Sequence, residues 1–324
     1  MKSKTPSSAI EIISELNLKQ VPTGQISCYW LKIISNGIGQ SIRIPIMIAK
    51  GTTKGKVLGI TAVIHGDELN GVPVIQRLFS QIDPSKLKGT IIGVPGANIS
   101  AMLRQQRRFD DNEDLNRIFP GKEIGTASQM YAYRFLNRIV KNFNYHLDLH
   151  TASYGRINPY YIRADLSREI TSHLSHLLNP QIILHKPADL GNLRYSAEQL
   201  GIHSITVELG NPALYQEHLI EANLVGIGNV ISHLGMWEKP IIQPEKPVLV
   251  CQRSHWFHTD KGGLLETFHQ PTDRIAKGDL IGRIRNLFGK TIAEYQAPFD
   301  GIMIGKSINP ISQTGARVMH LGVE

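Results

Sequence analysis

The chain has 324 residues, 41% of them hydrophobic, enough for a large buried core in one large or two moderate domains. Its two distant cysteines, Cys28 and Cys251, provide no disulfide framework, and no stretch approaches the ~20 consecutive apolar residues of a membrane span. The 35 basic and 27 acidic residues give a net charge of +8, but the basic residues form no block, so we expect no binding to nucleic acid. From the two unpaired cysteines and the lack of a membrane span, we expect a cytoplasmic protein that does not bind membranes.

The first part of the chain predicts a short helix and a hairpin. Residues 8–18 have the spacing of a short amphipathic helix. The apolar runs 26–34 and 40–49 flank Asn36-Gly37, a pair typical of a two-residue type I′ turn.

From residue 57 strand-like and helical segments alternate. The apolar runs lie at 57–64, 89–95, 145–149, 159–164, 181–185 and 203–209. Segments of helical periodicity lie between and after them, at 69–82, 127–142, 166–178, 192–200 and 214–235. This alternation predicts an α/β fold around a mixed or mostly parallel sheet flanked by helices.

The alternation stops near residue 237, where a proline-rich stretch, about 237–247, is typical of a linker. Beyond it, short strands are broken by glycine-containing turns, and residues 262–284 faintly resemble residues 300–321. We therefore expect two domains, 1–240 and 241–324, the second an all-β, barrel-sandwich-like module.

Four chemically active side chains stand at the ends of predicted strands. His65 and Glu68 follow the run 57–64, with Gly66 expected to allow a tight turn between them; His150 and Glu208 end two further runs. The carboxyl ends of strands in an open α/β sheet meet at the ligand crevice. Two histidines and a glutamate can hold a metal with one position open, and a second glutamate can move a proton.

The polar loop 107–121 has the composition of a carboxylate clamp. Asn116 offers an amide and Arg117 a guanidinium, which binds carboxylates bidentately. Asp114 is expected either to orient this loop or to cap a turn.

Four motifs in order carry a family resemblance. HGDELNG (65–71), DLNRIFPG (114–121), DLHTA (148–152) and TVELG (206–210) together resemble the succinylglutamate desuccinylase/aspartoacylase family of zinc carboxypeptidase-like hydrolases. The likeness covers most of residues 40–235. The C-terminal module resembles the β domain of the larger members.

The resemblance implies a role for each matching residue. One zinc ion per chain would be bound by His65, Glu68 and His150. Glu208 would be general base and then general acid. An arginine before the DLNR segment would stabilise the oxyanion, and Arg108 is preferred here over the adjacent Arg107. Further contacts with substrate anions are expected from Asn116, Arg117, Arg194, Arg156 and Arg163.

Other positions follow less directly. Asp67 points off the face shared by the two nearby ligands, so we expect it to orient the loop or a ligand. Which tyrosine contacts substrate is left open among Tyr160, Tyr161 and Tyr295. Lys290, in the turn NLFGKT, lacks the methionine-flanked setting of a carrier lysine, so no biotin or lipoyl attachment is expected.

The predicted activity is zinc-dependent hydrolysis of the amide bond of a small N-acyl amino acid. Two alternatives are a zinc carboxypeptidase-type peptidase acting on small peptides and a non-catalytic, metal-containing binding protein. The open ligand position argues against a non-catalytic binding protein, because structural zinc sites are usually closed by four protein ligands. The acyl group, the amino acid and any homo-oligomer are left open.

Overall fold

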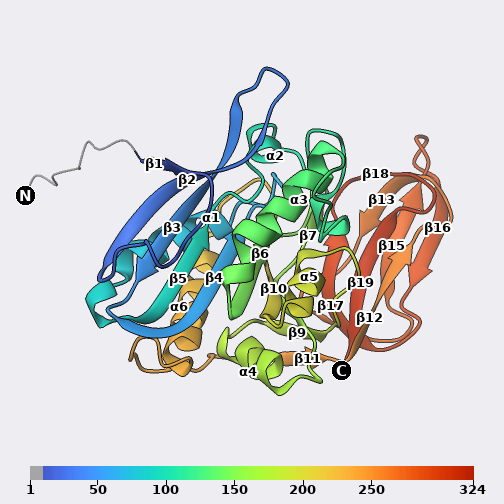
Figure 1. Cartoon of the computed structure of the whole chain (residues 1–324). Coiled ribbons are helices and arrows are strands. Elements are labelled where there is room, and N and C mark those ends of the chain that lie inside the picture. The colour runs from blue at the N-terminus through green and yellow to red at the C-terminus, as the bar shows by residue number, and fades with distance from the viewer. Residues whose placement is uncertain (1–9) are drawn as a thin grey trace, which may run out of the picture.

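The computed structural model describes residues 10–324 and is built around one ten-stranded sheet (Figure 1). The strands of this sheet are β1 Glu11–Ile13, β2 Gln25–Ser35, β3 Ser41–Lys50, β4 Thr53–Ala62, β5 Lys88–Val94, β6 Tyr145–His150, β8 Tyr160–Ala164, β9 Ile182–His185, β10 His203–Leu209 and β11 Leu249–Cys251. They lie in the order β1-β2-β3-β5-β4-β6-β10-β8-β9-β11. The central strands β5, β4, β6 and β10 are mutually parallel, whereas β3 runs antiparallel to β2 and β5, and β8 runs antiparallel to β10 but parallel to β9. The predicted mixed, mostly parallel sheet is confirmed.

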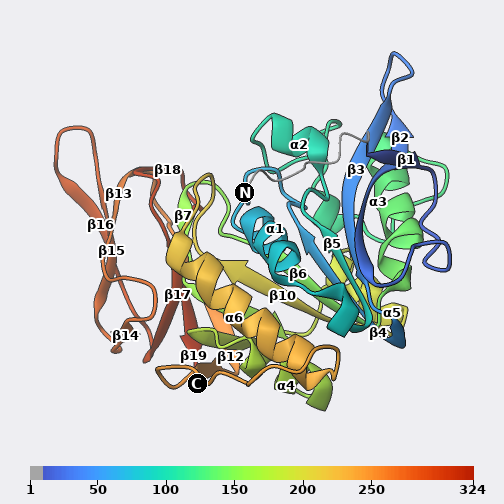
Figure 2. The same ribbon diagram turned by 90° about the vertical axis from the view of Figure 1, so that its left-hand side faces the viewer.

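Helices cover both faces of the sheet (Figure 2). On one face lie α1 (Gly71–Gln81), α4 (Glu169–Leu177) and α6 (Glu217–His233). On the other lie α3 (Ala127–Arg138) and α5 (Leu193–Gln199). Each set packs on its own apolar core, so the central strands are buried on both faces. The five predicted helices are confirmed to within a few residues at each end.

The predicted N-terminal helix over 8–18 is wrong. Residues 8 and 9 lie outside the described part of the chain, and Glu11–Ile13 form β1, which pairs in parallel with β2. An isolated helix of this length is marginal in water, whereas an edge strand gains hydrogen bonds from the sheet at once.

The predicted hairpin forms, but its turn is longer than two residues. Asn36 and Gln40 close a five-residue loop, in which the Asn36 side-chain oxygen accepts bonds from the backbone N–H groups of Ile38 (3.2 Å) and Gln40 (2.9 Å). The left-handed conformation falls on Gly39, with φ 78°. Asn36 therefore organises the loop through its side chain rather than through its own backbone angles.

The C-terminal residues form two antiparallel sheets. One contains β12 (Arg253–His258), β14 (Arg274–Ile275), β17 (Gly301–Ser307) and β19 (Arg317–Val323); the other contains β13 (Gly263–Thr267), β15 (Leu280–Arg285), β16 (Thr291–Gln296) and β18 (Ile311–Ser312). Their inner faces share an apolar core. The two similar sequence halves exchange short strands, because β14 pairs with β17 and β18 pairs with β13. The all-β module is confirmed.

Two short strands join the main sheet and the C-terminal sheets. β11 follows the linker but pairs with β9 at the edge of the main sheet. β7 (Arg156–Ile157) lies in the connection between β6 and β8 of the main sheet but pairs with β17 of a C-terminal sheet. A shared apolar cluster seals this contact: Tyr161, Ile182, Leu184, Cys251, Ile302 and Ile304. The predicted boundary at residue 241 thus falls before a strand of the main sheet.

Within residues 10–324, none of the helices is both long enough and apolar enough to cross a bilayer.

Candidate active site

The carboxyl ends of three parallel strands bring the predicted site together. β6 ends at His150 itself, and β10 places Glu208 directly opposite His150 in register. On the other side β4 pairs Ala62 with Leu149, one residue before His150. The loop that leaves β4 then carries His65 and Glu68 to the same edge.

An unusual turn directs that loop. Val63 adopts φ 65°, a conformation unfavourable for a β-branched residue, and this residue rather than Gly66 takes the left-handed angle. Gly66 is required for a different reason. A Cβ added there would lie 2.1 Å from the carbonyl carbon of Ala101, because the loop presses directly on the backbone of α2 (Ile99–Leu103).

His65, Glu68 and His150 form one buried group suited to a metal ion. The potential ligand atoms lie within 4.8 Å of one another. Glu68 Oε1 is 2.8 Å from His65 Nδ1, and Glu68 Oε2 is 2.8 Å from His150 Nδ1. Two imidazoles and one carboxylate are the ligand set of many catalytic zinc sites, so the residues present fit a single metal ion.

Each histidine is held from behind by a second carboxylate. His65 Nε2 lies 3.0 Å from Asp114 Oδ1, and His150 Nε2 lies 2.9 Å from Asp148 Oδ2. A carboxylate on Nε2 fixes that nitrogen as the proton carrier and leaves Nδ1 free to bind a metal. Asp114, expected to orient its own loop, thus also contacts the imidazole of His65.

A buried polar chain continues behind Asp148. Thr61 Oγ1 donates to Asp148 (2.6 Å) and contacts His146 (2.8 Å), whose other nitrogen reaches Ser204 (2.8 Å). Burial lowers the pKa of His146 to about 4, so this ring is neutral at pH 7. Sequence reasoning missed Asp148, although its position two residues before His150 places both on one face of the strand.

Asp148→Asn is expected to weaken metal affinity about 10–100-fold, because an amide keeps the shape but not the charge that makes His150 a strong ligand. Competition with a chromophoric chelator measures this. Asp165→Asn, a half-buried carboxyl that binds Ser167 instead, is the control. Unchanged affinity in Asp148→Asn would show that the carboxylate does not tune the site.

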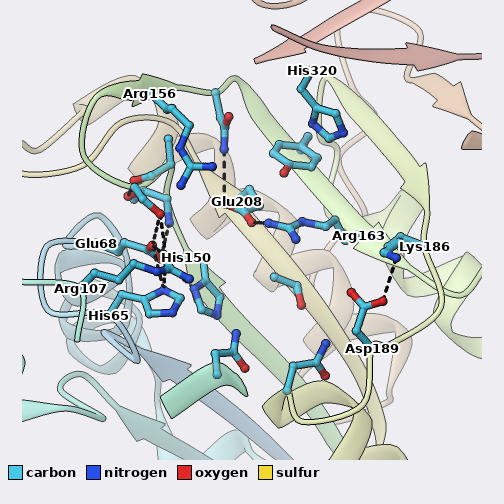
Figure 3. A pocket seen from close by; sticks show the side chains of 18 of the residues that line it. His65, Glu68, Arg107, His150, Arg156, Arg163, Lys186, Asp189, Glu208 and His320 are labelled. Atoms are coloured by element: carbon cyan, nitrogen blue, oxygen red, sulfur yellow. Dashed lines mark hydrogen bonds and ion pairs between the residues drawn. The ribbon is translucent and has the colours of Figure 1, made fainter. Parts of the chain in front are cut away.

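The metal group lies at one end of a cavity of about 260 Å³ (Figure 3). Glu208 lies in its middle and the Lys186–Asp189 ion pair (2.8 Å) at the opposite end. Its lining is strongly basic: Arg107, Arg117, Arg156, Arg163, Arg194, Arg317 and Lys186. Such a cavity attracts anionic ligands.

Glu208 is buried and faces this cavity (Figure 3). Arg163 forms an ion pair with its Oε1, and Asn158 Nδ2 lies 3.5 Å from its Oε2. The cation fixes the carboxylate's orientation.

Arg107, not Arg108, is the arginine that faces the metal group. Arg108 is exposed, bonds the Asn112 carbonyl and does not line the cavity, so the preference for it is corrected. Arg107 instead donates to Ser153 Oγ (2.6 Å), and its Nη1 lies 3.1 Å from Glu68 Oε1. The irregular loop turns adjacent side chains in opposite directions, which no periodic pattern reveals.

The predicted substrate residues all line the cavity: Asn116, Arg117, Arg156, Arg163 and Arg194. The Asn116 side-chain oxygen accepts a bond from the Leu193 backbone (2.8 Å), which leaves its amide N–H groups for a ligand. Arg194 donates to the Arg163 carbonyl (2.9 Å), and burial lowers its pKa to about 10, so it stays charged at pH 7.

Other predicted positions lie beside the cavity. Asp67 is buried and its Oδ2 accepts a bond from the Tyr154 backbone (3.3 Å), so it connects two loops outside the metal group. Among the three tyrosines left open, Tyr161 lines the cavity. Tyr160 bonds the Leu178 carbonyl in the core, and Tyr295 bonds Asp260 in the C-terminal sheets.

The C-terminal sheets supply three cavity residues that sequence reasoning missed: Trp256, Arg317 and His320. They come from β12 and β19, more than a hundred residues after the metal ligands, and no local motif marks them. The pairings of β7 with β17 and of β11 with β9 hold this part of the chain beside the cavity.

Comparison with known proteins agrees with the geometry. The model of the succinylglutamate desuccinylase/aspartoacylase catalytic domain matches residues 54–234, more than half of the chain. The chain belongs to this family. Membership in the family, together with the buried His–Glu–His group, identifies it as a metallohydrolase acting on amide bonds.

Individual proteins match most of the chain in sequence or in fold. The N-alpha-acetyl-L-2,4-diaminobutyric acid deacetylase of Halomonas elongata is 26% identical over 281 residues, 82% of this chain and 81% of that protein. The product-bound ectoine utilization protein EutE of Ruegeria pomeroyi has a similar fold, with TM-score 0.86 and 21% identity over 94% of this chain and 98% of its own. A succinylglutamate desuccinylase/aspartoacylase of Rhodobacter sphaeroides matches equally, with TM-score 0.86 and 21% identity over 97% and 99%.

Proposed function

We propose that the protein is a zinc-dependent deacylase that hydrolyses the amide bond of small N-acyl amino acids to a carboxylate and a free amine. One observation carries the proposal. The buried group His65, Glu68 and His150 leaves an open side towards a basic cavity, and Glu208 faces that cavity from the neighbouring strand. The deacetylase name of the relative from Halomonas elongata supports an N-acyl amino acid as substrate.

Zinc held by these three residues would supply Lewis-acid chemistry, polarising the carbonyl and making water acidic near pH 7. Glu208 then accepts the proton of the attacking water and delivers it to the departing amine, whose nitrogen must leave protonated. Arg163 holds the Glu208 carboxylate towards the cavity throughout.

Arg107 stabilises the oxyanion that develops on the carbonyl oxygen. Arg107 also contacts Glu68 and His65, at atoms that would bind the metal, so these two contacts would be lost when a metal is present. Its two hydrogen bonds to Asp114 (2.9 and 3.1 Å) involve none of these atoms and would remain. Asp114 therefore anchors the guanidinium beside the metal group. Asn116 and Arg117, which also line the cavity, bind the substrate's carboxylate.

Metal analysis followed by a substrate panel tests this function. Purified protein is expected to hold about one zinc ion per chain, as a single group of three ligands allows. With zinc supplied, it should release amine from N-acetyl and N-succinyl amino acids and leave dipeptides largely intact. Faster cleavage of dipeptides would identify a peptidase, and zinc binding without any hydrolysis would identify a binding protein. We expect the enzyme to act in the cytoplasm, where its two free cysteines stay reduced.

A further inference from the structure

A column of polar side chains runs behind the metal group on one face of the main sheet. His146, Asp148 and His150 occupy alternate positions of β6, so their side chains point to the same face. The strand register places Thr61 of β4 directly opposite Asp148, and Ser204 of β10 directly opposite His146. Residues directly opposite each other share a face, so three neighbouring strands contribute to this column.

The column is enclosed by the core. Thr61, His146 and Ser204 are fully buried. The ring of Phe143 packs against the imidazole of His146, with the ring centroids 5.6 Å apart. It occupies the space beside Gly59, which stands directly opposite His146 in β4; a Cβ added to Gly59 would lie 2.2 Å from a ring carbon of Phe143. Polar groups buried in this way must find their hydrogen-bond partners in one another.

Proton counting gives the hydrogen bonds of the column a single direction. The Thr61 hydroxyl donates its one proton to Asp148 Oδ1 (2.6 Å), so its oxygen must accept from His146 Nε2, which lies 2.8 Å away. His146 therefore carries its proton on Nε2. Its ring is neutral, because burial lowers its pKa to about 4, so Nδ1 accepts a bond from the hydroxyl of Ser204 (2.8 Å). Every donor in the chain points towards Asp148.

This chain ends on the carboxylate that holds a metal ligand. Asp148 Oδ1 accepts from Thr61, while Oδ2 lies 2.9 Å from His150 Nε2. Because its two oxygens are engaged by residues of different strands, the carboxylate is held facing the imidazole. Hydrogen bonds that share one direction also strengthen one another in a low-dielectric interior.

We propose that His146 is a positioning residue for the metal site, although it bonds Thr61 and Ser204 rather than a metal ligand. Through Thr61 it fixes the Asp148 carboxylate, and that carboxylate keeps Nδ1 of His150 available to zinc. Ser204 holds the His146 ring in the tautomer that this requires. The inference rests on the proposed function only in taking His150 as a zinc ligand, and it requires no particular substrate.

Thr61→Val removes the hydroxyl and keeps the shape of the side chain. We expect it to weaken zinc affinity about tenfold, at the lower end of the effects of outer partners on a metal site. Competition with a chromophoric chelator measures this. Thr61→Ser returns the hydroxyl and should recover most of the loss. Thr90→Val, the same change at a buried threonine of β5, is the control and should leave the affinity unchanged.

A double variant tests whether the effect passes through Asp148. When Thr61→Val is combined with Asp148→Asn, it should cost no further zinc affinity, because the chain then no longer ends on a carboxylate. His146→Gln and His146→Leu test the imidazole itself. The glutamine amide can still donate to the Thr61 hydroxyl, so this variant should bind zinc more tightly than His146→Leu.

Nitrogen NMR of protein labelled at its 13 histidines gives the tautomer directly. The signal that His146→Gln removes belongs to His146. In the wild type we expect this ring to be protonated on Nε2, with and without zinc. In Thr61→Val the proton should move towards Nδ1, because Ser204 is then the remaining partner of the ring. A residue that only fills space would show no such change.

The outcomes separate this inference from the proposed function. Wild-type zinc affinity in Thr61→Val, at an unchanged melting temperature, overturns the inference, as do additive losses in the double variant or a wild-type His146 protonated on Nδ1. If Thr61→Val fails to fold, the wild-type tautomer and the ranking of the two His146 variants decide it. Zinc binding that responds to these variants, without hydrolysis of any N-acyl amino acid, leaves the inference standing and refutes the proposed function. A wild type that binds no zinc overturns both.

Discussion

Replacing Glu208 with glutamine is expected to lower kcat by about 10²–10⁴-fold, the range of a lost general acid–base catalyst. Glutamine has nearly the same shape, so it can keep the contact with Asn158. It cannot accept a proton from water or return one to the amine. The residue lies on β10, opposite His150 but outside the three-ligand group, so zinc content should persist.

Turnover of the best N-acyl substrate and zinc per chain, measured on the same preparation, check this expectation. Glu169→Gln, an exposed glutamate at the start of α4, is the control and should change neither quantity. Near-normal turnover in Glu208→Gln would eliminate Glu208 as the proton carrier. Loss of zinc in that variant would instead indicate that Glu208 helps to bind the metal.

Arg107→Met is expected to lower kcat by about 10²–10³-fold, the effect of losing one donor to a developing oxyanion. Methionine retains much of the length of the side chain but carries no charge and no N–H group. The neighbouring Arg108→Met is a matched control, because Arg108 is exposed and bonds only the Asn112 carbonyl among the described residues. It should stay within about twofold of wild type, as for ordinary surface substitutions.

The pair of variants also tests the side-chain directions themselves. Zinc content should be retained in Arg107→Met, because Asp114 still holds His65 when the guanidinium is gone. A large loss in Arg108→Met with little change in Arg107→Met would reverse the assignment that the structure supports.

Local sequence patterns predicted the parts of the site that local structure determines. His65, Glu68, His150 and Glu208 each follow or end an apolar strand, and parallel strands bring their carboxyl ends to one edge. The same reasoning predicted the alternation of strands and helices, since buried strands and amphipathic helices each have a distinct period.

Features without a period could not be predicted in this way. Arg107 and Arg108 are adjacent in an irregular loop, so their directions depend on contacts with Asp114 and Asn112 that only the folded chain makes. Residues 11–13 form a strand only because β2 offers them an edge. The position of Trp256 and Arg317 on the cavity wall depends on strand pairing across more than a hundred residues.

The strand pairing of β7 with β17 has a consequence for the order in which a growing chain becomes functional. The three metal ligands and Glu208 are all synthesised by residue 208, whereas Trp256 and Arg317 emerge only near the end. A protein cut short after α6 would keep His65, Glu68, His150 and Glu208, yet it would lose the cavity residues Trp256, Arg317 and His320. It would also expose the apolar side chains of Tyr161, Ile182 and Leu184, which the C-terminal strands otherwise cover. Premature termination would therefore yield an aggregation-prone polypeptide with an incomplete cavity.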